Sequence, residues 1–175
     1  MNCNAWRIVT PLVGSAASAE HIDTAQHQRV SRPVDLARRP RRRRDIGTVK
    51  KQIVTTDDAP SSPLYSQAVR VGSMLYLSGM AGIDVTTKQL AGSTIQDQTR
   101  QALRNCAAVV GAAGGTLDDV VQVTVLLADP EDFAGMNEEY QKVFSVDPPA
   151  RAVAKLGVNL PNLLVSIMMT AHVEG

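Results

Sequence analysis

The chain of 175 residues has few cysteines and no long apolar run. Its two cysteines, Cys3 and Cys106, are far apart and belong to no C-x-x-C or histidine-rich pair, so neither a disulfide scaffold nor a zinc site is indicated. No apolar stretch approaches the roughly 18–20 residues that cross a bilayer, which predicts no membrane span. We therefore expect an intracellular protein with one folded unit, because domains usually have about 100–200 residues.

The usual catalytic signatures are also missing. The sequence has no G-x-S-x-G, no Walker loop, no G-x-G-x-x-G and no H-E-x-x-H, so no cofactor and no metal is indicated. Only His172 lies outside the N-terminal segment, and a single histidine on the last predicted strand is more often an edge or core residue than a base. Cys106, among alanines and valines of a predicted helix, is typical of a buried, unreactive thiol.

The net charge of +1 conceals two different segments. Residues 1–51 hold eleven Lys and Arg against four Asp and Glu, whereas residues 52–175 hold seven against thirteen, which gives net charges of +7 and −6. The first 48 residues lack helical or strand periodicity, and the run of arginines within residues 38–44 repels itself. We therefore expect a disordered leader over residues 1–48 and a folded domain over residues 49–175.

Four interpretations of this leader stay open. It is a nucleic-acid-binding arm, a mitochondrial transit peptide, a nuclear address, or translated upstream sequence that is absent from the native protein. In the last case translation starts at Val49, encoded by a GTG start codon, directly before the first predicted strand. A transit peptide matches poorly because the basic residues concentrate at the far end of the leader. We expect a cytoplasmic protein, or a mitochondrial one if the leader is a transit peptide.

From residue 52 onward the pattern predicts the order β-β-β-α-β-α-β-β. A type II′ hairpin turn is expected at Gly72-Ser73. The first helix is expected to begin after a Thr94 cap and to stop at Gly114-Gly115, and the second to begin with Asp129 as cap and Pro130 as its first residue. Strands are expected over residues 52–56, 67–71, 74–79, 118–128, 150–157 and 164–173, the fourth of them buried on both faces because it is β-branched and nearly uncharged.

This order predicts an α/β (α+β) fold with a single mixed sheet. Right-handed crossovers place both helices on one face of that sheet. The other face is then bare, although the last strand offers apolar residues on both sides. Because the chain supplies no third layer, the expected cover is another copy of the same chain.

Arg151 is the residue with the clearest chemical implication. It begins a predicted strand among apolar neighbours, with no acid nearby in sequence, and a guanidinium in such surroundings needs a partner. A ligand carboxylate would supply a bidentate partner, and an acid from the second helix or from another subunit would supply a structural one. The residues alone leave both possibilities open.

Residues 52–175 resemble the RidA (YjgF) family of reactive-intermediate imine deaminases, often labelled endoribonuclease L-PSP. The matching stretches are APSSPLYSQAVRVG at 59–72, LYLSGM at 75–80, QTRQALRN at 98–105, LDDVVQVTVLLADPEDFAGMNEEY at 117–140 and PPARAV at 148–153. The resemblance implies a chorismate-mutase-like α/β fold and a homotrimer with ligand clefts between subunits. It also implies hydrolysis of 2-imino or enamine acids to 2-oxo acids and ammonia.

By position, the resemblance assigns a role to several residues of this chain. Arg151 matches the arginine that binds the substrate carboxylate, and the positions that match the lining of the cleft are Tyr65, Ser78, Gly79 and Asn137. The chain departs from the family pattern at three positions. Val153 replaces a cysteine, Ser166 replaces the glutamate that helps to position water, and Met80 replaces a glutamine. Catalysis would then rest on Arg151, with Tyr65 or Ser166 orienting water.

Two further functions remain as alternatives. A binding module would keep Arg151 and the cleft for a small carboxylate metabolite without turnover. An RNA-binding or endoribonuclease-type protein would use Arg38 to Arg44 as phosphate contacts, but residues 52–175 carry a net charge of −6 and no histidine pair. We rank the deaminase first, the binding module second and the nucleic-acid protein third.

Overall fold

A computed structural model describes residues 50–174 of the chain. The predicted disordered leader, its arginine run and the candidate start at Val49 lie outside the described residues. The described part forms one sheet and two α-helices, α1 (Ile95–Ala112) and α2 (Phe133–Val143). The strands are β1 (Lys51–Val54), β2 (Ala68–Val71), β3 (Met74–Leu77), β4 (Met80–Ala81), β5 (Val120–Leu127), β6 (Ala150–Lys155) and β7 (Val165–His172). No helix within these residues has both the length and the apolar character needed to span a membrane.

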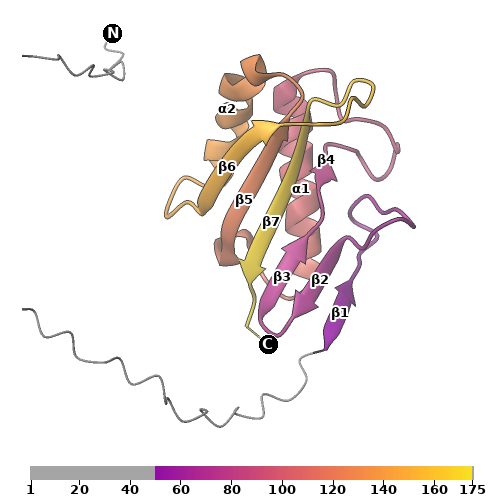
Figure 1. Cartoon of the computed structure of the whole chain (residues 1–175), viewed down its shortest axis with the longest axis vertical. Helices are drawn as coiled ribbons and strands as arrows, with labels where there is room; N and C mark the ends of the chain where they lie inside the picture. The colour runs from indigo at the N-terminus through magenta and orange to yellow at the C-terminus, as the bar shows by residue number, and fades with distance from the viewer. Residues whose placement is uncertain (1–49, 175) are drawn as a thin grey trace, which may run out of the picture. The chain divides into compact units, whose positions relative to one another are not determined.

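The sheet is mixed, with the strand order β1-β2-β3-β7-β5-β6, and β4 also pairs with β7. Only β5 and β6 are parallel among these pairs, and α2 connects them. Both helices cover the same face of the sheet (Figure 1), and the core lies between them and the strands. The predicted single mixed sheet with two helices on one face is therefore confirmed.

The local signals at element ends act as the sequence predicts. The Thr94 side chain accepts a hydrogen bond from the Asp97 backbone N–H, which caps α1, and Gly114 ends that helix with a φ of 85°. Gly72 has a φ of 62° at the turn between β2 and β3, the positive value that the first central residue of a type II′ turn requires. These three positions fix where α1 starts and stops and how the first hairpin closes.

Three details of the prediction are wrong, and the first is the short strand β4 after Gly79, which the expected order does not contain. The segment after Asp129 starts as a short 3-10 helix over Pro130–Asp132, and α2 begins only at Phe133. The predicted strand over 118–128 is not buried on both faces of the single chain, because Val121 and Gln122 are exposed.

The face of the sheet opposite the helices, here called the bare face, carries a mixed surface. Residues that point away from the helices come from each central strand, because side chains alternate between the faces of a sheet. Met74, Tyr76, Gln122, Thr124, Leu126, Ser166, Met168, Thr170 and His172 all belong to this set, and none of them is fully buried. The predicted bare face is therefore present in the described chain.

An ion cluster joins the two helices on the outer side. Glu139 is only 5% exposed and accepts hydrogen bonds from Arg100, at 3.0 Å from both Nε and Nη2, and from Lys142 Nζ at 2.6 Å. These bonds, first from Arg100 and then from Lys142, lower the pKa of Glu139 to about 2. The carboxylate thus stabilises the contact between α1 and α2 at neutral pH.

We expect Glu139→Gln to lower the free energy of unfolding by about 1 kcal/mol at pH 7, a value kept small because Arg100 and Lys142 are partly solvated. The pKa of Glu139 is lower in the folded chain than its ordinary 4.5, so its contribution is present above that value and is lost as the pH falls toward 2. Thermal unfolding from pH 7 to pH 2 would show the wild type and the variant converging. The control is Glu138→Gln on the exposed side of α2. A difference in stability between the wild type and Glu139→Gln that stays constant from pH 7 to pH 2 would contradict the role given to the Glu139 carboxylate.

Candidate functional site

Arg151 lies on β6 and its side chain turns toward α2. Its Nη1 donates a hydrogen bond to Asn137 Oδ1 at 2.7 Å, and its Cζ lies 4.5 Å from the centroid of the Tyr140 ring. The Phe133 ring is 5.9 Å from the same atom. Phe133, Asn137 and Tyr140 share one face of α2 because they are spaced by four and three residues. We call Arg151 and these three α2 residues the arginine group.

The guanidinium of Arg151 has no acidic partner within residues 50–174. No carboxylate of this part of the chain lies within 4.0 Å of it, and Nε and Nη2 donate to no acceptor there. Its neighbours are a neutral amide and an aromatic face, which attracts a cation through the ring quadrupole. Arg151 is exposed, so its Nε and Nη2 are free to donate two hydrogen bonds to a planar anion such as a carboxylate.

Tyr140 supports this arrangement from inside the protein. It is 6% exposed and packs on Phe144 with ring centroids 4.8 Å apart, which fixes the ring beneath the guanidinium. Its buried hydroxyl has no hydrogen-bond partner among the described residues. Burial raises the pKa of Tyr140 above its ordinary value, although the charge of Arg151 opposes the shift. Tyr140 therefore stays neutral, and its contact with the Arg151 guanidinium is made through the face of its ring.

The other predicted site residues lie on or beside β3 and β7, in the middle of the sheet order, or in the segment before β2. Ser78 follows β3, and its Oγ donates to the backbone oxygen of Ser66 at 2.7 Å, which ties the segment after Tyr65 to this point. A Cβ atom on Gly79 would lie 2.7 Å from Ser166 Oγ, so Gly79 and Ser166 are in direct contact. We call Tyr65, Ser78, Gly79 and Ser166 the serine group.

A break in the sheet creates the serine group. β3 pairs with β7 at Tyr76↔Thr170, and β4 resumes the pairing at Met80↔Ile167, so the register shifts by one residue between the two strands. Ser78 and Gly79 occupy this break, and the Ser78 backbone N–H donates instead to the Gln67 backbone oxygen at 3.0 Å. A side chain at position 79 would require the Ser166 hydroxyl to move, because its Cβ would lie 2.7 Å from Ser166 Oγ.

The sheet separates the two groups within one chain. Arg151 is paired in parallel register with Val123, which is buried against the helices, so Arg151 and Val153 face the helix side. Ser166 is paired with Leu126 and points to the bare face. The structure therefore brings Arg151 together with Asn137, and Ser78 and Gly79 together with Ser166, but it does not bring these two sets together. Tyr65 is 50% exposed, and its position beside the serine group follows only from the Ser78 contact to the neighbouring Ser66.

Sequence reasoning missed the aromatic part of the arginine group. In the sequence, Phe133 and Tyr140 follow the helical spacing of an apolar stripe with Met136, Val143 and Phe144, which by itself indicates only a core-facing side. Met136 is buried, but Phe133 is 45% exposed at the edge of β6. The available signal was the spacing of Phe133 and Asn137, an exposed aromatic residue and an asparagine four residues apart on the helix that lies beside the strand of Arg151.

Other chemistry is sparse in the described residues. Cys106 is fully buried on α1, and burial raises the pKa of its thiol, which suppresses the thiolate. Within residues 50–174 no group of three or more His, Cys, Asp or Glu side chains is arranged to hold a metal ion. His172 lies exposed at the end of β7, paired with Met74.

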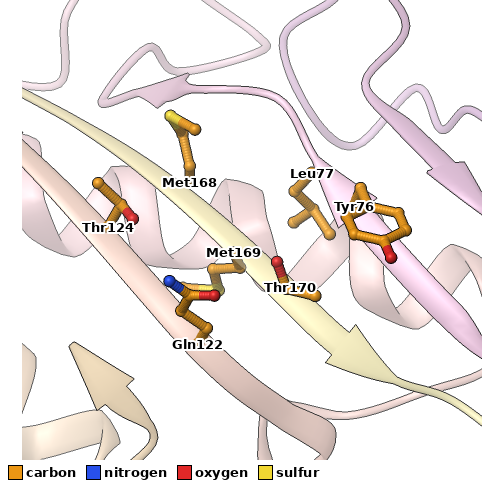
Figure 2. A pocket seen from close by; sticks show the side chains of 7 residues that line it. All are labelled: Tyr76, Leu77, Gln122, Thr124, Met168, Met169 and Thr170. Atoms are coloured by element: carbon orange, nitrogen blue, oxygen red, sulfur yellow. The ribbon is translucent and has the colours of Figure 1, made fainter. Parts of the chain in front are cut away.

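The bare face itself is hollowed near its centre. A shallow cavity of about 260 Å³ lies over β3, β5 and β7, and Figure 2 shows the side chains that line it. These are Tyr76, Leu77, Gln122, Thr124, Met168, Met169 and Thr170. The lining combines methionines with neutral polar groups and holds no carboxylate or cation, so it suits protein packing better than proton transfer.

Known proteins match the chain closely over the described region. A RutC family protein of Pyrococcus horikoshii is 40% identical over 126 residues, which are 71% of this chain and 99% of that protein. The human 2-iminobutanoate/2-iminopropanoate deaminase is 40% identical over 108 residues, which are 61% of this chain and 79% of that protein. Both matches extend over most of the relative's own length.

Solved structures share the fold. RidA from the Antarctic bacterium Psychrobacter has a TM-score of 0.66 at 37% identity, with 70% of this chain and 99% of that chain covered. E. coli TdcF with bound serine has a TM-score of 0.65 at 31% identity, with 69% and 98% covered. The family model described as Endoribonuclease L-PSP matches residues 56–173, which include both residue groups. The chain therefore belongs to the RidA (Endoribonuclease L-PSP) family.

Proposed function

We propose that this protein hydrolyses reactive 2-imino acids, or their enamine tautomers, to 2-oxo acids and ammonia. The observation that carries the proposal is the state of Arg151: an exposed guanidinium, oriented by Asn137 and Tyr140, that no carboxylate of residues 50–174 neutralises. The human relative named for 2-imino acid deamination and the TdcF structure with bound serine, an amino acid, support a ligand with a carboxylate.

The reaction needs little from the protein because the imine carbon is already electrophilic. Water adds to C2 of the imine and one of its protons moves to the nitrogen, which gives a carbinolamine. The hydroxyl proton of the carbinolamine then moves to the nitrogen as the C–N bond breaks, which releases ammonia and leaves the 2-oxo acid. Arg151 would hold the carboxylate and so fix C2 in place. The hydroxyl groups of Ser166 and Tyr65 would orient the water, since the serine group holds no carboxylate.

Arg151 and Ser166 face opposite sides of one sheet, so a complete site needs two chains. The proposed assembly is a homotrimer in which the serine group of one chain meets the arginine group of the next.

We expect light scattering of the full chain at micromolar concentration to give the mass of a trimer. Met168→Asp, which places a charge on the bare face where Met168 is 39% exposed, should shift the mass toward a monomer because a buried, unpaired charge is costly. Val143→Asp, at the same exposure on α2, is the matched control and should leave the mass unchanged. A monomeric wild type contradicts the shared site as well as the trimer.

The direct test of function is hydrolysis of an imine generated in the assay by an amino-acid oxidase, measured as faster release of ammonia or 2-oxo acid when the protein is present. An acceleration that requires Arg151 supports the proposal. Absence of any acceleration, with 2-oxo acids still bound, rejects it in favour of the second candidate.

That second candidate is a non-catalytic binding module for a small carboxylate metabolite. The specific observation in its favour is Ser166, a neutral residue at the position of the water-positioning glutamate of the family. A ribonuclease, which the label of the family model names, is less well supported. Residues 52–175 carry a net charge of −6, and His172 is the only histidine of the described part.

A further inference from the structure

A shallow groove lies between α1 and α2, which run next to each other on the helix side of the sheet (Figure 1). Its volume is about 280 Å³. The apolar part of its lining consists of Leu103, Ala107, Leu117 and Val143, of which Val143 is 39% exposed. The charged part consists of Arg100, Arg104, Glu139 and Lys142. We call these eight residues the interhelix groove, and none of them belongs to the arginine group, the serine group or the bare face.

Cations outnumber acids around the interhelix groove. Its three cations and one carboxylate give a formal charge of 3 − 1 = +2, whereas residues 52–175 as a whole carry −6. The carboxylate of Glu139 already accepts hydrogen bonds from both Arg100 and Lys142. Arg100 donates its remaining Nη1 bond to Asp97 Oδ1 at 3.0 Å. The groove is therefore a locally positive surface on an acidic domain, and its one acid is taken by two of its three cations.

Arg104 is the cation that these acids leave without a partner. It is exposed, and no carboxylate of residues 50–174 lies within 4.0 Å of its guanidinium. It follows Arg100 by four residues on α1, and like charges at this spacing on a helix repel each other. Asp84, which lines the next hollow along α1 together with Arg104, accepts instead from the backbone N–H groups of Thr86 and Thr87, at 2.9 and 2.8 Å. A negative charge supplied by another molecule would relieve this repulsion.

The size and shape of the groove favour a protein segment over a small metabolite. Pockets that enclose small molecules usually have volumes of about 300–1,000 Å³, above that of this groove. The α1 residues of the groove, from Arg100 to Ala107, share one face of the helix and extend for about 10 Å, or two helical turns. A third helix laid along this stripe would place its i, i+4 and i+7 side chains on the apolar strip. Acidic residues beside those positions would then face the cations.

We propose that the interhelix groove binds an acidic amphipathic helix of a partner protein. The apolar side chains of that helix cover Ala107 and Val143, and its carboxylates pair with Arg104 and Lys142. Because the groove is short and shallow, the interface is of the small, transient kind, and we expect a Kd of roughly 10–100 µM. This inference goes beyond the proposed function, since the groove shares no residue with the arginine group or the serine group.

The probe is a fluorescein-labelled, C-terminally amidated peptide of about 14 residues, with leucines spaced by three and four residues, glutamates beside them and alanines on the far face. Its binding to the full chain is measured by fluorescence anisotropy. One comparison peptide has the same composition in an order that destroys the leucine stripe, and another has lysines in place of the glutamates. We expect the probe to bind at least about tenfold more tightly than either, with an advantage over the lysine peptide that shrinks at about 1 M salt.

Three results would overturn the inference. The first is no binding of the probe, and the second is equal binding of the three peptides. The third is tighter binding of a labelled single-stranded RNA of similar length, which would assign the cations of the groove to nucleic acid instead.

Variants locate the binding site of the probe. Arg104→Glu should weaken the probe at least about tenfold, because it replaces attraction by like-charge repulsion. Lys155→Glu, the same charge change at an exposed position of β6, is the matched control and should have little effect. Val143→Asp should also weaken the probe at least about tenfold, because it places a charge on the apolar strip. If Arg104→Glu and Val143→Asp both bind the probe as the wild type does, the groove is not the docking site.

The arginine group provides the test that separates this inference from the proposed function. Arg151→Ala should bind the probe as the wild type does, although it is expected to lose affinity for 2-oxo acids. Arg104→Glu should show the opposite pattern. A probe that binds the wild type but not Arg151→Ala would show that its glutamates occupy the arginine group, which overturns the groove as the docking site and leaves the proposed function standing.

Discussion

Replacement of Arg151 by alanine is expected to weaken binding of 2-oxo acids about thirty- to several-thousand-fold. The reason is the loss of a charge-assisted bidentate contact, worth about 2–5 kcal/mol where the site excludes water. Arg151→Lys keeps the charge but not the planar fork, so it should restore only part of the affinity. Binding would be measured by titration calorimetry, with Arg104→Ala, an exposed arginine on α1, as a control that leaves affinity unchanged.

Arg151→Ala also distinguishes a role of Arg151 in binding the ligand from a role in a structural ion pair. No carboxylate of residues 50–174 lies within 4.0 Å of Arg151, so alanine at this position leaves no acid of the same chain unpaired. The folded state loses mainly the stacking on Tyr140, about 0.5–1 kcal/mol, and the melting temperature should fall by only about 5 °C or less. A much larger fall with ligand affinity intact would show that Arg151 pairs with an acid of a neighbouring subunit.

Ser166→Glu is expected to raise imine hydrolysis about a hundredfold. A carboxylate at this position would accept a proton from the attacking water, and a positioned general base contributes about 10²–10⁴-fold. The structure offers room for the longer side chain because Ser166 is half-buried on the bare face and Gly79 beside it has no Cβ. The measurement is release of 2-oxo acid from an imine generated by an amino-acid oxidase.

Ser166→Gln is the matched control for this change. It has nearly the shape of glutamate but accepts no proton at neutral pH, so the rate should not rise above the wild-type level. Light scattering of both variants checks that the substitutions leave the assembly intact. An unchanged rate for Ser166→Glu, with 2-oxo acids still bound, would indicate that the cleft binds rather than hydrolyses, and the binding module would become the preferred function.

Much of the secondary structure was predictable because its signals are local. Thr94 and Gly114 mark the ends of α1 through hydrogen bonds and a backbone angle that involve only neighbouring residues. The start of α2 was placed too early because Asp129 and Pro130 are equally good signals for a 3-10 turn. Propensity near a helix terminus does not distinguish these two continuations.

Buried amide side chains illustrate what local signals miss. Gln67 is buried and donates to the backbone oxygens of Thr56, Ala59 and Pro60, which holds the segment between β1 and β2. Gln98 on α1 accepts from the Leu164 backbone N–H and donates to the Asn162 backbone oxygen, 64 residues away. The spacing of these residues along the chain does not predict such contacts, because an amide side chain is ordinarily expected to be exposed to solvent.

The sequence by itself determined the order of the elements apart from β4 and the short 3-10 segments, the two-layer fold with a bare face, the family, and Arg151 as the residue in need of a partner. Each of these depends on periodicity, capping or motif, which are read within a few residues. Only the tertiary structure decided that Arg151 stands on the rings of α2 and that Ser166 lies against Gly79 on the other side of the sheet. The physical reason is that the order β3-β7-β5-β6 joins segments far apart in the chain, and this pairing fixes which face each side chain takes.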